Sequence, residues 1–107
     1  MSTYQLAALG ALGDPTRRAI FELLATRPRA VGELANELPV SRPAVSQHLK
    51  VLKQVSLVTD SAEGTRRLYR VDRRGVHALR DYLDQLWDNA LTAYAAAVEQ
   101  DSEREEG

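Results

Sequence analysis

A long helical stripe of apolar residues near the end of the chain constrains the fold most. Between Arg73 and Gln100, apolar side chains recur at three- and four-residue intervals, the spacing of a helix that packs along another helix. They are Val76, Leu79, Leu83, Leu86, Ala90, Ala93 and Ala97, widened by Trp87, Leu91, Tyr94 and Val98. A chain of 107 residues is one domain of ordinary size and cannot cover so long a face from within.

We therefore expect a second copy of the chain to cover this stripe, together with the helix expected over residues 3–12. The alternative is a terminal helix that only folds back on its own core. The residues predicted to form the dimer interface are Leu6, Leu9, Leu79, Leu83, Leu86, Trp87, Ala90, Leu91 and Tyr94.

Residues 41–52 show a second helical pattern. Val45, Leu49 and Leu52 mark one buried stripe, whereas the polar residues are Ser, Gln, His, Arg and Lys, without one acid. These side chains donate hydrogen bonds to phosphates and base edges, and a DNA backbone repels carboxylates. The pattern predicts a DNA-recognition helix.

The elements around this helix are typical of a helix-turn-helix. Asp14-Pro15 marks the cap and first residue of a helix, residues 31–38 form a short helix, and Pro39-Val40 is a tight turn before the cap at Ser41. A short helix, a tight turn and an acid-poor second helix make this motif.

A basic hairpin is expected to follow. Residues 56–59 and 67–71 have strand patterns, and the turn-rich residues 60–65 link them, with Gly64 near the tip. Arg66 and Arg67 follow that tip, so we interpret the hairpin as a wing that contacts the DNA backbone or the minor groove. The alternative is a solubilising surface hairpin.

Charge is segregated along the chain. Residues 41–80 carry nine basic and three acidic side chains, a net charge of +6, although the whole chain has a net charge of −1. The acids gather in residues 99–107, which we expect to be a disordered tail after a winged-helix DNA-binding and dimerisation domain in residues 1–98. The local positive field favours a polyanionic partner.

Composition excludes several other classes of protein. The chain has no cysteine, which removes disulfides, thiolate metal sites and a cysteine nucleophile. Neither a membrane span nor an export signal is visible. No nucleophile with a base partner and no glycine-rich phosphate loop is found, so an enzyme is not expected.

The chain resembles the ArsR/SmtB winged-helix repressors over roughly residues 4–98. The resemblance is carried by the segments Leu9–Arg18 and Ser46–Lys50, and by the hairpin sequence Gly-Thr-Arg-Arg-Leu-Tyr-Arg-Val. It implies a mainly α fold with a small β-hairpin, in the order α-α-α-α-β-β-α, that dimerises through its terminal helices. It also implies a homodimeric transcriptional regulator, most often a repressor, in the bacterial cytoplasm at the nucleoid, with double-stranded DNA as partner.

The chain departs from the metal-sensing members of that family. Residues 31–38 have no thiol where many members bind soft metals. His77, Asp81 and Asp84 fall on one flank of the last helix, but a single imidazole is a weak candidate site. We expect neither a metal nor a cofactor, and the sequence leaves the inducer open. A metal-responsive repressor that uses these ligands remains an alternative.

The predicted DNA-binding residues lie on the recognition helix and at the wing tip. Gln47 is the best base reader, because its amide pairs with adenine N6 and N7, and Lys50 suits a phosphate. Ser41 is equally suited to capping the helix, and His48 to packing against the preceding helix. The full set is Ser41, Arg42, Pro43, Ser46, Gln47, His48, Lys50, Arg66 and Arg67.

The sequence leaves two functions open. The first is a sequence-specific repressor that binds a pseudo-palindromic operator as a homodimer. The second is a winged-helix protein-interaction module that does not bind DNA, which the acid-free basic face disfavours.

Overall fold

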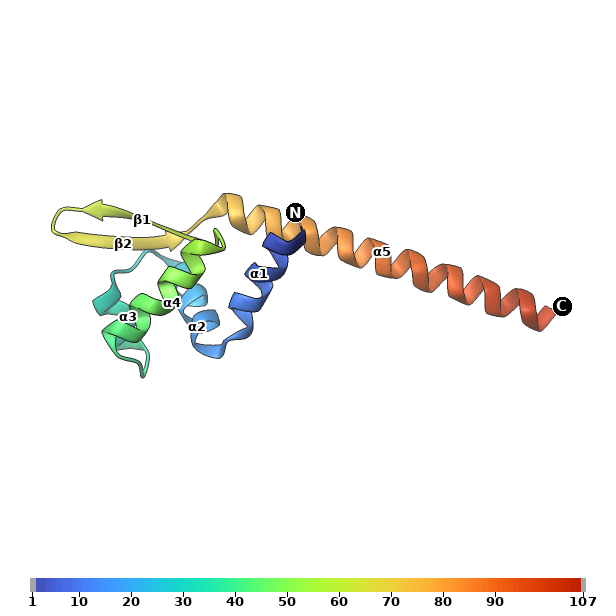
Figure 1. Ribbon diagram of the computed structural model, residues 1–107, viewed down its shortest axis with the longest axis horizontal. Helices are drawn as coiled ribbons and strands as arrows, with labels where there is room; N and C mark the ends of the chain where they lie inside the picture. The colour runs from blue at the N-terminus through green and yellow to red at the C-terminus, as the bar shows by residue number, and fades with distance from the viewer. Residues whose placement is uncertain (1, 107) are drawn as a thin grey trace.

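The computed structural model describes the backbone of residues 2–106 and the side chains of residues 4–104. Within that range it contains five helices and one two-stranded antiparallel sheet (Figure 1). The elements are α1 (Ser2–Gly13), α2 (Pro15–Thr26), α3 (Val31–Glu37), α4 (Arg42–Gln54), β1 (Val58–Glu63), β2 (Arg66–Val71) and α5 (Arg73–Glu106). This is the predicted winged helix-turn-helix order.

The core lies where α1, α2, α3 and α4 meet the start of β1. Its fully buried side chains include Ile20 of α2, Leu34 of α3 and Leu57 before β1, together with the predicted stripe of α4, Val45, Leu49 and Leu52. Asp14 caps α2 by accepting a hydrogen bond from the Arg17 N–H at 2.9 Å. The predicted cap and buried stripe are both confirmed.

The hairpin is longer than predicted. β1 and β2 pair without interruption from Val58 opposite Val71 to Glu63 opposite Arg66, so residues 60–63 are strand and not the expected linker. Gly64 adopts a φ of +64°, the left-handed conformation that a two-residue hairpin turn needs at its first position. Gly64 and Thr65 alone reverse the direction of the chain. The polar residues 60–63 that precede them therefore pair with β2 as part of the strand.

Helix α5 extends far beyond the rest of the molecule (Figure 1). Its 34 residues correspond to about 50 Å of helix. The radius of gyration is 19.4 Å, whereas a compact chain of this length has about 13 Å. The distal half of α5 therefore has no cover from its own chain.

The helix also continues through the segment expected to be a disordered tail. Residues 99–106 are helical in the structure, while Gly107 lies outside the described residues. Glu, Gln and Arg are good helix formers, and extending an existing helix avoids the cost of nucleation. The acidic side chains therefore keep this segment in solvent, but they do not prevent it from forming a helix. That the DNA-binding unit ends near residue 98 stays a prediction.

Candidate nucleic-acid interface

Helix α4 presents a polar face whose orientation is fixed by its own buried stripe. The Ser41 hydroxyl accepts a hydrogen bond from the Ala44 N–H at 3.3 Å, and Pro43 lies in the first turn. With Val45 and Leu49 buried in the core, the opposite face of α4 is exposed. We call this the reading face: Arg42, Pro43, Ser46, Gln47 and Lys50.

The reading face carries no acid, as the sequence predicted. Neither Arg42 nor Lys50 forms an ion pair among the described side chains. The guanidinium of Arg42 lies over Gly32 of α3, where an added Cβ would come within 3.0 Å of its Nη2 atom. The small residue at position 32 thus lets Arg42 lie across the short helix.

Ser41 takes the capping role that the sequence left open, whereas His48 packs toward α2 and not against the preceding helix α3; DNA contact remains a prediction for both. His48 is half-buried, and its Nδ1 atom lies 4.0 Å from Oδ2 of Asp14. That carboxylate caps α2, and the hydrogen bond from the Arg17 backbone lowers the pKa of Asp14. His48 therefore packs toward the start of α2 and not on the reading face, while Ser41 caps α4.

The two wing arginines are exposed but already paired. Arg66 lies 3.3 Å from Glu33 of α3, and Arg67 lies 2.8 Å from Asp60 of β1. Glu33 also accepts the Ala30 backbone N–H, and this hydrogen bond, followed by that from Arg27, lowers the pKa of Glu33. Each wing arginine thus has a carboxylate partner in the DNA-free chain, and its exposed guanidinium keeps further donors free.

Asp60 ties the wing to the recognition helix. Its side chain is 9% exposed and lies 2.7 Å from Nζ of Lys53 on α4, besides its contact with Arg67 on β2. The hydrogen bond from Lys53 is the main cause that holds the pKa of Asp60 below its ordinary value. The carboxylate is therefore charged at neutral pH, and its stabilising contribution disappears only as the pH falls through that lowered pKa.

Arg29 is a second link that sequence reasoning missed. It is 6% exposed, its guanidinium donates to the Leu23 carbonyl at the end of α2, and its Nε atom lies 2.7 Å from Glu37 of α3. Its backbone pairs with Tyr69 of β2 through two hydrogen bonds of 3.0 and 2.8 Å. Arg29 thus joins the helix-turn-helix to the wing. The sequence signal was only a basic residue beside a proline.

Apolar side chains lie exposed along α1 and α5, where the dimer interface was predicted. Trp87 is 66% exposed and Leu91 is 59% exposed. Leu6, Leu86, Ala90 and Tyr94 are exposed as well, whereas Leu9 and Leu83 are partly buried. We call this set, together with Val98, the apolar face.

Leu79 is the exception among the predicted interface residues. It is 7% exposed and belongs to the core of its own chain. The stripe begins where α5 still packs on α1, so its first leucine is covered from within. On α5, only the residues beyond that contact remain for a partner.

The weak metal candidates do not form a site in the described part of the chain. His77, Asp81 and Asp84 are all exposed, and no group of three His, Cys, Asp or Glu side chains between residues 4 and 104 is arranged to hold a metal ion. None of the described helices is long and apolar enough to cross a membrane.

Three comparisons with known proteins agree with this geometry. A family model described as a helix-turn-helix domain matches residues 12–60. The HTH-type transcriptional regulator Rv2034 of Mycobacterium tuberculosis is 57% identical over 105 residues, which cover 96% of this chain and 98% of the relative.

Solved structures share the fold over most of its length. An ArsR-like transcriptional regulator from Rhodococcus sp. RHA1 is 29% identical with a TM-score of 0.76, over 86% of this chain and 90% of the other. A homodimeric winged helix-turn-helix DNA-binding domain from Mycobacterium bovis is 34% identical with a TM-score of 0.63, over 81% of this chain and 82% of the other.

Proposed function

Because this chain belongs to the ArsR/SmtB family of winged helix-turn-helix transcriptional regulators, a DNA-binding family without enzymatic activity, we propose that it represses transcription as a homodimer on a pseudo-palindromic operator. The single observation that carries the proposal is the reading face of α4, which is exposed, basic and free of acids. Such a face fits the major groove, where phosphates surround base edges rich in acceptors.

The apolar face supports the homodimer. A relative with the same fold is described as homodimeric, and the large apolar side chains that α1 and α5 leave exposed suit a two-fold interface. A two-fold dimer presents two copies of α4 to two half-sites separated by about one helical turn of DNA, or a multiple of it. Occlusion of a promoter by such a dimer, at the bacterial nucleoid in the cytoplasm, is the simplest mechanism of repression.

Gln47 and Lys50 are expected to contribute differently to DNA binding. Gln47→Ala removes the best base reader and should lower discrimination between operator and random DNA by about 1–3 kcal/mol per base pair read. Lys50→Ala should weaken binding to both DNAs alike. It should also reduce the slope of log affinity against log salt by about 0.9 for each phosphate that is no longer neutralised.

Fluorescence anisotropy titrations at several salt concentrations measure both quantities. The two variants serve as each other's controls, because they are nearly one helical turn apart on the same exposed face. If both variants bind operator and random DNA as the parent does, α4 is not the recognition helix.

Releasing the wing from Asp60 is expected to strengthen binding to random DNA. Asp60→Asn frees Lys53 and Arg67 from their shared carboxylate. Each cation that then meets a phosphate steepens the salt dependence by about 0.9 in slope. Discrimination should fall, because the wing is no longer fixed to α4.

Glu63→Gln is the matched control for this prediction. It makes the same change in charge on the same strand, at a side chain that is 55% exposed and 3.5 Å from Arg70. Equal salt slopes for the two variants would show that Asp60 contributes only its charge and does not restrain the wing.

A further inference from the structure

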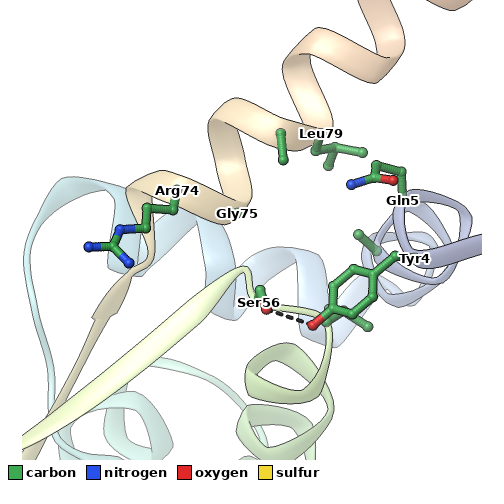
Figure 2. A pocket seen from close by; sticks show the side chains of 9 residues that line it. Tyr4, Gln5, Ser56, Arg74, Gly75 and Leu79 are labelled. Carbon is green, nitrogen blue, oxygen red and sulfur yellow. Dashed lines mark hydrogen bonds between the residues drawn. The ribbon is translucent and has the colours of Figure 1, made fainter. Parts of the chain in front are cut away.

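A small cavity lies between α1, the end of α4 and the start of α5. It has a volume of about 230 Å³, enough for a molecule larger than the benzene that a cavity of about 150 Å³ accepts. Its walls are mostly apolar, with Ala8, Val55, Ala78 and Leu79 among the lining residues. Figure 2 shows Tyr4 and Gln5 of α1 facing Gly75 and Leu79 of α5.

One wall of the cavity is a strained turn. Ser56, directly after the recognition helix, has a φ of +61°, a conformation that non-glycine residues adopt rarely and mostly where the surroundings enforce it. Its hydroxyl lies 2.7 Å from the Tyr4 hydroxyl, which also donates to the Gln54 carbonyl at 3.2 Å (Figure 2). These hydrogen bonds therefore join α1 to the C-terminal end of α4.

A polar group in the opposite wall lacks a protein partner. The side-chain carbonyl oxygen of Gln5 is buried and forms no hydrogen bond, which is costly for an amide. In Figure 2 the amide of Gln5 projects from α1 toward Leu79, with its nitrogen toward the cavity. The amide nitrogen is a donor and can donate to a carboxylate oxygen of a ligand, whereas the unpaired carbonyl oxygen is an acceptor and cannot pair with a carboxylate.

A cation lies at the mouth of the cavity. Arg74 lines it, is exposed, and has no ion-pair partner among the described side chains. Its guanidinium points away from the cavity in Figure 2, so contact with a ligand requires this long, exposed side chain to rotate toward the mouth. Apolar walls with one amide and one guanidinium suit a ligand that has an apolar body and a carboxylate, which pairs with arginine through two parallel hydrogen bonds.

The cavity is separate from the middle of the apolar face. With about 100° of rotation per residue, Gly75 and Ala78 lie about 80° to 160° around α5 from Leu83 and Tyr94. On the same basis, Tyr4 and Ala8 lie about 100° to 160° around α1 from Leu6 and Leu9, whereas Gln5 lies only about 40° from Leu9. Leu86, at the edge of the apolar face, lies only about 20° around α5 from Gly75, so the cavity borders that edge and lies away from the middle of the face.

We propose that this cavity binds a small apolar carboxylate, of the size of an aromatic or short branched acid, as an effector. Arg74 and the Gln5 amide hold the carboxylate, and Ala8, Val55, Ala78 and Leu79 surround the body. Val55 and Ser56 end the recognition helix, so an occupant changes the packing that sets the position of α4. The effector role rests on the proposed DNA binding, whereas the binding site itself does not.

Isothermal titration of the DNA-free protein with benzoate tests the site. Saturable binding of one benzoate per chain is expected. Ala78→Phe should abolish it by filling the cavity, and Ala62→Phe, at an exposed position on β1, should leave it unchanged. Absence of saturable binding up to about 10 mM benzoate, a concentration above the dissociation constants of weak millimolar ligands, would overturn the site.

Benzyl alcohol, a neutral molecule of similar shape, tests the chemical class. Arg74→Gln should weaken benzoate binding about tenfold or more, as removal of a charge-assisted pair implies, and leave benzyl alcohol unaffected. Equal effects on the two probes would overturn the carboxylate. Benzoate should also shift operator affinity in the parent and not in Ala78→Phe, and an unchanged operator affinity would overturn the effector role.

Discussion

Leu91→Asp is expected to convert the dimer into folded monomers that no longer hold the operator. Leu91 is 59% exposed in the isolated chain, so the substitution removes little packing from the monomer. In a two-fold dimer it removes two buried leucines, about 3–6 kcal/mol of apolar burial. That change raises the dissociation constant of the dimer by about 10²–10⁴, and the two buried charges add to it.

Sedimentation equilibrium measures the effect, and the emission of Trp87 supports it. Trp87 is the one tryptophan in the chain and is 66% exposed without a partner, so dilution of the parent should shift its emission to the red as dimers dissociate. Gln85→Asp is the control, because it introduces the same charge on the opposite, exposed side of α5. A dimeric Leu91→Asp variant with parental operator affinity would contradict the assignment of the apolar face.

Among the substitutions of glycine by alanine in this chain, Gly75→Ala is expected to destabilise the fold most. A Cβ at position 75 would lie 1.5 Å from the Ser56 carbonyl oxygen and 2.5 Å from the carbonyl carbon. Backbone atoms cannot rotate away, so α5 or the strained turn at Ser56 must move. Overpacking of this kind costs about 3 kcal/mol, which corresponds to a fall of about 10–20 °C in Tm for a domain of this size.

Gly13→Ala is the matched control for this prediction. Gly13 is the last residue of α1 and is exposed, and an added Cβ there would meet nothing within 4 Å. A surface change of this kind is expected to stay within about 0.5 kcal/mol. Thermal unfolding of both variants at one protein concentration makes the comparison. A Gly75→Ala protein as stable as the parent would show that α5 does not pack this closely on Ser56.

Local patterns were sufficient to predict the helix-turn-helix and its orientation. The spacing of Val45, Leu49 and Leu52 predicts which side of α4 is buried, because helical periodicity depends only on residues that are close in sequence. The exposure of Gln47 and Lys50 follows directly. The same reasoning found most of the exposed apolar residues, although Leu79 is buried and Leu9 and Leu83 are partly buried in their own chain; their role in a dimer stays a prediction.

Contacts between distant residues could not be predicted in this way. The ion pairs of Asp60 with Lys53 and Arg67, and of Glu33 with Arg66, depend on how the hairpin crosses the helices. No periodic pattern in the sequence predicts the angle between the hairpin and the helices. The cavity at Gln5 and the close approach of Gly75 to Ser56 likewise arise only when α1, α4 and α5 are packed together.

Strand boundaries failed for a different reason. Asp60 and Ser61 have poor strand propensity, but pairing with Tyr69 and Leu68 determines their conformation. Because the turn at Gly64 is tight, the pairing of the two strands continues to the tip of the hairpin. Tertiary and cross-strand contacts thus override the local preference of single residues.

Selection of bound sequences from a pool of random duplexes is the decisive measurement of operator recognition by a dimer. Enrichment of two inverted half-sites is expected, with centres about 10–10.5 base pairs apart or a multiple of that, and this symmetry should vanish with Leu91→Asp. If the parent protein enriches no sequence, even at low salt, it is not a sequence-specific DNA-binding protein.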